Sequence, residues 1–186
     1  MYLAPHPKRY AKMITFLLGS SNPQGNTQKF AEICCKASGG KLINISDYQF
    51  SPWDYSGNNM DDDFVQLADL LIQSSQIVFC TPVYWYSMSS QMKMFFDRFS
   101  DLITRRKQIG RSLSKKRTWL LAVGSEPTLP EGFEVPFSRT SDYFDMQYMG
   151  SVYGCSADDK FSQPDIIQAK AFGTKMQNKP LRPSDK

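Results

Sequence analysis

Apolar runs of strand length alternate with amphipathic segments along most of the chain. Four of these runs are apolar almost throughout, which is typical of parallel strands that are buried on both faces. A fifth, shorter run follows toward the C-terminal end. The pattern therefore predicts five strands, at residues 13–18, 41–45, 76–81, 118–123 and 150–153.

The segments between these runs have the 3.6-residue period of helices that bury one face. Phe30 and Cys34 share a face in the first, and the same period recurs at residues 64–72 and 92–103. A last helix is expected to begin at residues 162–165, which resemble a capping box. The alternation predicts an α/β three-layer sandwich with a five-stranded parallel sheet in the order 2-1-3-4-5. Ligands of such a sheet bind beyond the carboxyl ends of its strands, where the strand order reverses.

Polar, proline-containing ends flank this pattern, so we expect an N-terminal extension (1–12), one domain (13–177) and a C-terminal tail (178–186). The composition, 41% hydrophobic and 22% charged, is that of an ordinary soluble globular protein. No apolar run approaches the roughly 20 residues that span a bilayer, and no apolar leader opens the chain. The four cysteines lack CxxC spacing. We therefore expect reduced thiols in a cytoplasmic protein with no membrane association.

The net charge of +4 is unevenly distributed. Residues 102–125 contain no acidic residue, whereas residues 105–117 hold seven lysines and arginines. This basic segment has two interpretations: a solvated loop, or a site that attracts an anion such as the phosphates of a nicotinamide dinucleotide. Nucleic acid is a weaker possibility, because the segment has few aromatic residues for base stacking.

A loop of small hydroxyl and amide residues, Gly19 to Thr27, connects the first predicted strand to the first helix. The first N–H groups of a helix are unpaired, and the helix dipole favours negative charge there. The loop has no lysine and no GxGxxG pattern, so it is neither a Walker A loop nor a dinucleotide fingerprint. An uncharged loop of this kind suits a phosphate held by neutral donors, and the phosphate of FMN is the candidate.

Three consecutive aromatic residues, Tyr84, Trp85 and Tyr86, follow the third predicted strand. Neighbouring side chains of an extended chain point in different directions, so all three cannot enter one core. They can instead form the wall of a site for a flat heterocycle, or an apolar patch for subunit contact.

Together, residues 19–27 and residues 81–98 (TPVYWYSMSSQMKMFFDR) resemble the NAD(P)H-dependent FMN reductase branch of the flavodoxin-like superfamily, over roughly residues 13–175. The resemblance implies a flavodoxin-like fold and an FMN site in three parts. The FMN phosphate would be held by Ser20, Ser21, Gln24, Asn26 and Thr27. The isoalloxazine and ribityl chain would be lined by Pro82, Val83, Tyr84, Trp85, Tyr86 and Ser87. The other edge of the flavin would be bordered by Gly124, Ser125 and Glu126.

The same resemblance implies an oxidoreductase in which hydride passes from NADPH or NADH, via flavin N5, to free flavin, a quinone or another small electrophilic acceptor. The flavin carries this chemistry, so no catalytic side chain is expected. The single histidine, His6, lies in the extension, which argues against histidine acid–base catalysis and a histidine-rich metal site. Residues 46–57 lack the cysteines that some relatives use for an iron–sulfur cluster. No metal is therefore expected.

Three further expectations concern the surface. Asp97 and Arg98 are expected to form an ion pair on a helix surface or at an interface. Residues 126–137 have three prolines and no clear helical pattern, so they are expected to form a lid or a partner contact. The surplus of aromatic and methionine residues from 84 to 99 indicates a homodimer or homotetramer.

Two other functions remain open on the sequence alone. One is a flavodoxin-like electron-transfer or binding module without its own nicotinamide activity, although true carriers of that kind are usually acidic. The other is a flavin-free regulatory or nucleic-acid-binding protein that uses the basic segment. Flavin content distinguishes the flavin-free protein from the reductase and the electron-transfer module. Oxidation of NADH or NADPH then distinguishes the reductase from the electron-transfer module.

Overall fold

The computed structural model describes residues 13–22, 24–157 and 159–177. Its centre is a sheet of five parallel strands in the order β2-β1-β3-β5-β6. These strands are β1 (Ile14–Leu18), β2 (Lys41–Asn44), β3 (Gln76–Tyr84), β5 (Arg117–Gly124) and β6 (Gln147–Ala157). The flavodoxin-like order that the sequence predicts is therefore present in the parallel part of the sheet.

The sheet is larger than the five strands predicted. Two short antiparallel strands extend it: β4 (Ser87–Met88) pairs with β3, and β7 (Lys160–Phe161) pairs with β6. The full sheet has seven strands, with β7 at the edge of the main path and β4 off that path. The prediction of a five-stranded sheet is therefore wrong. The two added strands were not predicted because each has only two residues, too few to show a periodic pattern.

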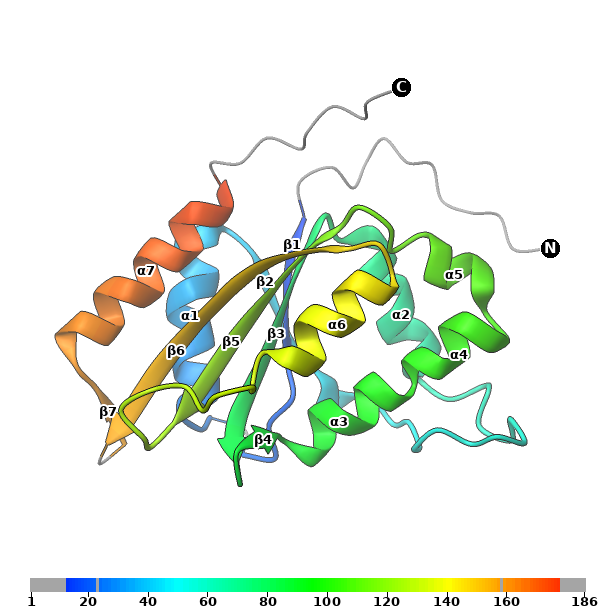
Figure 1. The fold of residues 1–186 in the computed structure, drawn as a ribbon, viewed down its shortest axis with the longest axis horizontal. Helices are drawn as coiled ribbons and strands as arrows, with labels where there is room; N and C mark the ends of the chain where they lie inside the picture. The colour runs from blue at the N-terminus through cyan, green and yellow to red at the C-terminus, as the bar shows by residue number, and fades with distance from the viewer. Residues whose placement is uncertain (1–12, 23, 158, 178–186) are drawn as a thin grey trace.

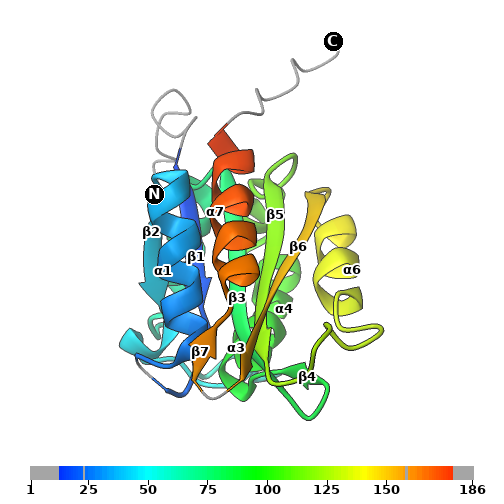
Figure 2. The same cartoon turned by 90° about the vertical axis from the view of Figure 1, so that its left-hand side faces the viewer.

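Helices cover both faces of the sheet (Figures 1 and 2). One face carries α1 (Asn26–Ser38) and α7 (Gln163–Gln177), which pack against each other. A second group lies on the other face: α2 (Phe64–Gln73), α3 (Ser90–Asp97), α4 (Phe99–Thr104), α5 (Lys107–Arg111) and α6 (Val135–Tyr143). A 3-10 turn, η2 (Ile45–Asp47), follows β2. Two buried apolar clusters, one on each face, confirm the three-layer sandwich.

Several boundaries differ from those predicted. The helix expected at 92–103 is divided into α3 and α4 at Arg98, and neither α5 nor α6 was predicted. Strand β6 (Gln147–Ala157) extends beyond the predicted residues 150–153 at both ends, because the added residues include polar Gln147 and Ser156 and do not continue an apolar run. The capping box of α7 is present: Ser162 Oγ accepts from the Asp165 N–H at 3.2 Å.

Parallel pairing brings the loops after β1, β3, β5 and β6 to one edge of the sheet, the lower edge in Figure 1. The amino ends of the strands meet at the opposite edge. In the described part of the chain, no helix is both long enough and apolar enough to cross a membrane. The predicted extension (1–12), which includes His6, and the predicted tail (178–186) lie outside the described residues.

Candidate functional site

Helix α1 begins with donors that are available to a ligand. Gly25 occupies its N-cap position in an extended conformation, and no described side chain caps the helix. Its first turn contains no acidic residue. By contrast, the Ser89 side chain caps α3 by accepting from the Met92 N–H at 3.1 Å. The start of α1 therefore combines free amides with the positive end of a 13-residue helix.

The loop before α1 is tied to the neighbouring strand ends. The Gly19 N–H donates to the Cys80 carbonyl at 2.8 Å, and Ser89 Oγ donates to the Gly19 carbonyl at 2.7 Å. Ser46 Oγ donates to the Ser20 carbonyl at 3.3 Å. A Cβ at position 19 would lie 2.9 Å from Met92, so glycine is needed for this close approach.

The five predicted phosphate residues all lie in this loop or the first turn of α1, but their side chains have different environments. Ser20 and Thr27 are buried, and Ser21 and Gln24 are exposed. Asn26 Nδ2 donates to the Asp159 carboxylate at 2.8 Å, so its amide already has a partner. Sequence reasoning missed Asp159, which lies 133 positions away along the chain.

The second predicted loop is a tight hairpin. Strand β3 continues through Tyr84, and β4 begins at Ser87, so Trp85 and Tyr86 form a two-residue turn. Both have positive φ, 49° and 64°, which such a turn requires and which non-glycine residues rarely adopt. Trp85 is 94% exposed and Tyr86 is 72% exposed. The aromatic side chains are therefore outside the core, as the sequence predicts.

A cavity of about 240 Å³ lies between this hairpin and the end of β5. Six of the residues predicted from the sequence to border the flavin line it, namely Val83, Trp85, Tyr86, Gly124, Ser125 and Glu126, together with Pro130 and Tyr153. The phosphate-loop residues and Pro82, Tyr84 and Ser87 are not among its lining residues. Pro130 belongs to the segment of residues 126–137 that was expected to form a lid or a partner contact. Sequence reasoning missed Tyr153, which has a place in the predicted fifth strand and no predicted role in the site.

Tyr153 and Gly124 determine the shape of this cavity. Partial burial, with smaller contributions from nearby anionic groups, raises the pKa of Tyr153 to about 12, so its hydroxyl is protonated at neutral pH. That hydroxyl donates to the Glu126 carbonyl at 2.7 Å. A Cβ at position 124 would lie 2.7 Å from the Tyr153 oxygen, so a larger residue there would crowd the cavity.

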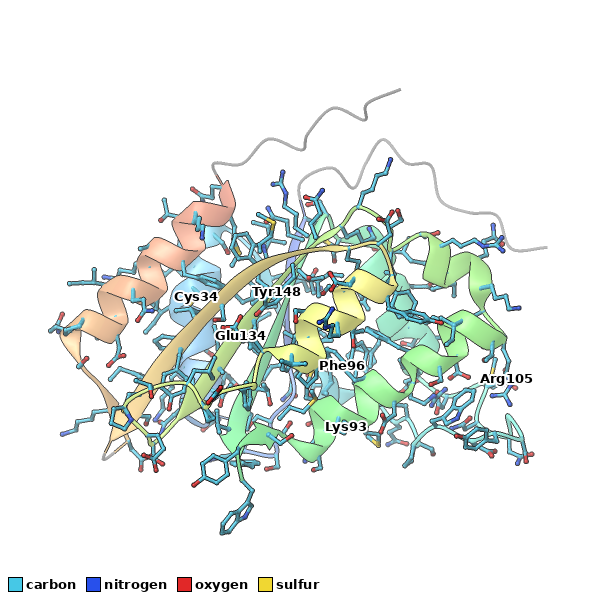
Figure 3. The ribbon with its side chains drawn as sticks, viewed as in Figure 1. Cys34, Lys93, Phe96, Arg105, Glu134 and Tyr148 are labelled. Carbon is cyan, nitrogen blue, oxygen red and sulfur yellow. The ribbon has the colours of Figure 1, made fainter. Side chains whose placement is uncertain are left out.

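The proline-containing segment after β5 is held at both ends by β6. Tyr148 donates to Glu134 Oε2 at 2.6 Å, and Ser151 donates to Glu134 Oε1 at 2.8 Å. Figure 3 labels Tyr148 and Glu134, which lie near each other. The other end is the contact between Tyr153 and Glu126. The segment closes one side of the cavity and then continues into α6.

The expected Asp97–Arg98 surface pair is wrong. Asp97 pairs instead with Lys93 at 2.5 Å on the exposed face of α3. Arg98 is 1% exposed and donates to Asp101 at 2.7 Å and to Asp62 at 2.5 Å. It also holds the loop between β2 and α2 through the Ser51 carbonyl at 2.9 Å. Arg98 therefore stabilises the fold beside the site rather than forming a surface pair.

The family model of NADPH-dependent FMN reductases matches residues 13–127, which include both predicted loops. The chain belongs to the NADPH-dependent FMN reductase family. It is accordingly an oxidoreductase whose cofactors are FMN and a nicotinamide electron donor. The described residues contain no group of three or more His, Cys, Asp or Glu arranged to hold a metal ion.

Individual relatives agree with this family. The chain is 24% identical over 151 residues to a Bacillus subtilis protein named as an NAD(P)H-dependent FMN-containing oxidoreductase, YwqN, covering 76% of this chain and 83% of that one. A solved Trp repressor binding protein from Bacillus subtilis has a TM-score of 0.68 and 21% identity, over 94% of this chain and all of that one. An NADPH-quinone reductase from P. pentosaceus has a TM-score of 0.65 and 15% identity, over 90% and 99%. Both structures support the fold.

The residues at the carboxyl edge fit FMN. The start of α1 offers uncapped amides without an acidic residue in its first turn, which suits a phosphate. The cavity offers an aromatic wall and a glycine floor, which suit the edge of a flat ring. Asp159 is the one negative group found bonded to the predicted phosphate loop in the described chain.

Proposed function

We propose that the protein oxidises NADPH or NADH and reduces a small, flat electrophilic acceptor, such as free flavin or a quinone, at an FMN bound to the carboxyl edge of its sheet. One observation carries the proposal. Two loops singled out independently from the sequence lie at the same edge, and a cavity opens between the second loop and the end of β5. When bound, FMN supplies hydride transfer between the donor and the acceptor.

The residues of the chain would bind and orient the cofactor. The amides at the start of α1, with Ser20, Ser21 and Thr27, would hold its phosphate. Trp85 and Tyr86 would form the wall beside the flat ring, with room for the nicotinamide or the acceptor on the exposed side of the hairpin. No proton-transferring side chain is required of the chain in this proposal.

The first test is a titration of the purified protein with FMN, followed by anaerobic addition of NADPH and then NADH. We expect a bound-flavin absorbance spectrum that bleaches with at least one nicotinamide. Bound flavin that dithionite bleaches and neither nicotinamide does would instead identify an electron-transfer module. Absence of FMN binding would refute the proposed site.

A charge variant locates the phosphate. Ser21→Glu places a carboxylate in the exposed loop before α1 and is expected to weaken FMN binding by about tenfold or more, through like-charge repulsion. The matched control is Ser90→Glu, since Ser90 is also an exposed serine at a helix start. Its FMN affinity should stay within about twofold of the parent. Equal effects of the two variants would contradict a phosphate at α1.

We also propose that the protein is a homodimer or homotetramer, but fewer residues support this than the aromatic and methionine residues 84–99 cited from the sequence. Met92, Phe95 and Phe99 are buried in the core, so they do not form a surface for a partner. The exposed aromatic side chains of the hairpin, Trp85 and Tyr86, remain as support. A monomeric mass by light scattering at micromolar concentration would contradict the proposed oligomer.

All four cysteines are free, which supports the proposed cytoplasmic location.

A further inference from the structure

The structure divides the basic segment of residues 105–117 into two groups. Arg105 and Arg106 donate to carbonyls of the loop between β2 and α2. Lys116 Nζ donates to two carbonyls at the end of α2. Lys107, Arg111 and Lys115 are different: within the described residues, none of these side chains has an ion pair or a hydrogen bond. Three cations of the segment are therefore available to a ligand, and two of them, Lys107 and Arg111, line one cavity.

Lys107 and Arg111 lie one turn apart on α5, at positions i and i+4, and both line a cavity of about 380 Å³. The cavity is bounded by α4, α5 and the end of α6, which lie on one side of the sheet (Figure 1). Gly110 packs α5 directly on α4, since a Cβ there would lie 2.3 Å from the Leu102 carbonyl oxygen. This close packing places the two cations beside the side chains of α4.

The floor of this cavity is apolar. Leu102 is 1% exposed, and the ring of Phe144 packs edge-on against Phe99 with centroids 5.4 Å apart. Ile103 and Tyr143 form a partly exposed apolar rim, at 40% and 69% exposure. The cavity therefore presents apolar surface and a pair of cations to the same ligand.

One acidic side chain lines the cavity, and it already has a partner. Asp145 Oδ2 accepts from Ser114 Oγ at 2.5 Å. The two cations outnumber this single carboxylate, so the lining is net positive. The volume falls in the range of small-molecule sites, about 300–1,000 Å³. An arginine and a lysine together suit a carboxylate, sulfonate or phosphate group.

The cavity lies at the opposite edge of the sheet from the candidate FMN site. Ser114 precedes β5 and Asp145 precedes β6, so both mark the amino ends of the strands. The loops proposed for FMN follow the carboxyl ends of β1, β3 and β5. The two cations of this cavity are thus not placed to contact a cofactor at the other edge, including the 2′-phosphate of NADPH.

We propose that the cavity between α4, α5 and α6 binds a small organic anion with a flat apolar body, at a site separate from that of FMN. The anionic group pairs with Lys107 and Arg111, and the apolar body lies against Leu102, Phe144 and Tyr143. This inference does not depend on the proposed reaction, because no residue of the carboxyl edge takes part.

The test uses 1-anilinonaphthalene-8-sulfonate, an aromatic sulfonate whose fluorescence rises on entering an apolar site. It is titrated into the full chain saturated with FMN, so that the carboxyl edge is filled. The double variant Lys107→Gln/Arg111→Gln is expected to weaken binding of the probe by about tenfold or more. The matched control Lys115→Gln/Lys170→Gln removes two exposed lysines that do not line the cavity and should stay within about twofold.

Two further arms keep the outcome decisive. Ile103→Glu places a carboxylate on the rim and should also weaken binding, while FMN affinity and thermal midpoint stay unchanged. 2-Naphthoate should displace the probe, and uncharged 2-naphthalenemethanol should not. Equal affinity of the two double variants would overturn the inference, and so would probe binding that occurs in FMN-free protein and is lost in FMN-saturated protein. If the chain binds no FMN, the same titration without FMN still tests this cavity, so the two proposals fail separately.

Discussion

Replacing Arg98 by methionine removes the buried cation that links three parts of the chain. Its guanidinium bonds Asp101 at 2.7 Å and Asp62 at 2.5 Å, and its Nη1 also donates to the Ser51 carbonyl. The guanidinium stacks over Phe64 with its carbon 4.6 Å from the ring centroid. Methionine preserves most of the apolar stem, so the variant chiefly deletes the charge and its hydrogen bonds.

The magnitude follows from what remains buried. Asp101 is 0% exposed and, among the described residues, keeps only Arg105 at 3.4 Å as a cationic partner. Removing one member of a buried pair costs about 3–5 kcal/mol, since an uncompensated charge is left inside. With a urea m-value of about 2 kcal/mol/M for a domain of this size, the midpoint of unfolding should fall by about 2 M. Urea unfolding followed by circular dichroism measures it.

The matched control is Lys93→Met, in the same helix. The Lys93–Asp97 pair is exposed, at 59% and 47%, and Figure 3 shows Lys93 on the outer side of α3. Exposed pairs contribute about 0–1 kcal/mol, so this midpoint should hardly move. If Arg98→Met costs less than about 1 kcal/mol, the buried network does not hold the loop between β2 and α2, and the reasoning is refuted.

The pH dependence of stability tests the same network. Partial burial alone raises the pKa of Asp62, but hydrogen bonds from Arg98 and two backbone amides outweigh it and hold that pKa below its usual range. The unfolded chain therefore binds this proton at higher pH than the folded chain. Its stabilising effect is complete above the unfolded pKa of about 3.9 and is lost as pH falls through the lower folded value. Asp62→Asn should flatten the acid side of the stability curve, and an unchanged slope would contradict the assignment.

Three other predictions concern the carboxyl edge. Trp85→Gly should leave the thermal midpoint of unfolding equal or higher, because glycine adopts a φ of 49° without strain. The same variant should lower the turnover of a flat acceptor. A thermal midpoint lower by several degrees would show that the Trp85 ring packs on the fold. Cys155 should react first with a thiol-specific reagent at pH 8, because burial raises the pKa of Cys34 to about 12 and also raises those of Cys35 and Cys80. FMN should slow this reaction, because Cys155 Sγ donates to the carbonyl of Ser125, which lines the candidate cavity. Asp159→Asn should tighten FMN binding at low salt, and an unchanged affinity would place this carboxylate away from the phosphate.

The position of the candidate site was predictable, because it follows from topology. Continuous apolar runs identify parallel strands, and parallel strands bring their following loops to one edge. The loop of residues 19–27 and the aromatic triplet therefore had to meet wherever the strand order placed β1 beside β3. That reasoning needed no side-chain contact, and the structure has the predicted order in its parallel strands.

The details that failed depend on contacts between distant residues. The sequence predicts that Arg98 pairs with its neighbour Asp97 on a helix surface or at an interface, whereas its partners are Asp101 and Asp62, the latter 36 positions away. Residues 85 and 86 adopt positive φ without glycine, which no turn signal in the sequence indicates. Strand β4 depends on that turn, so it was missed with it.

The carboxyl edge combines loops tied together by hydroxyl groups with an exposed aromatic tip. Hydroxyl groups of Ser46, Ser89 and Tyr153 each donate to a backbone carbonyl of a neighbouring loop, at 3.3, 2.7 and 2.7 Å. These bonds hold the segments proposed to contact FMN. Trp85, at the tip of the hairpin, is 94% exposed and has no such tie from its side chain among the described residues. In the proposed reaction, a nicotinamide and an acceptor would exchange at one face of the flavin. An exposed aromatic tip beside a tied cofactor loop would suit alternate binding of these two flat ligands.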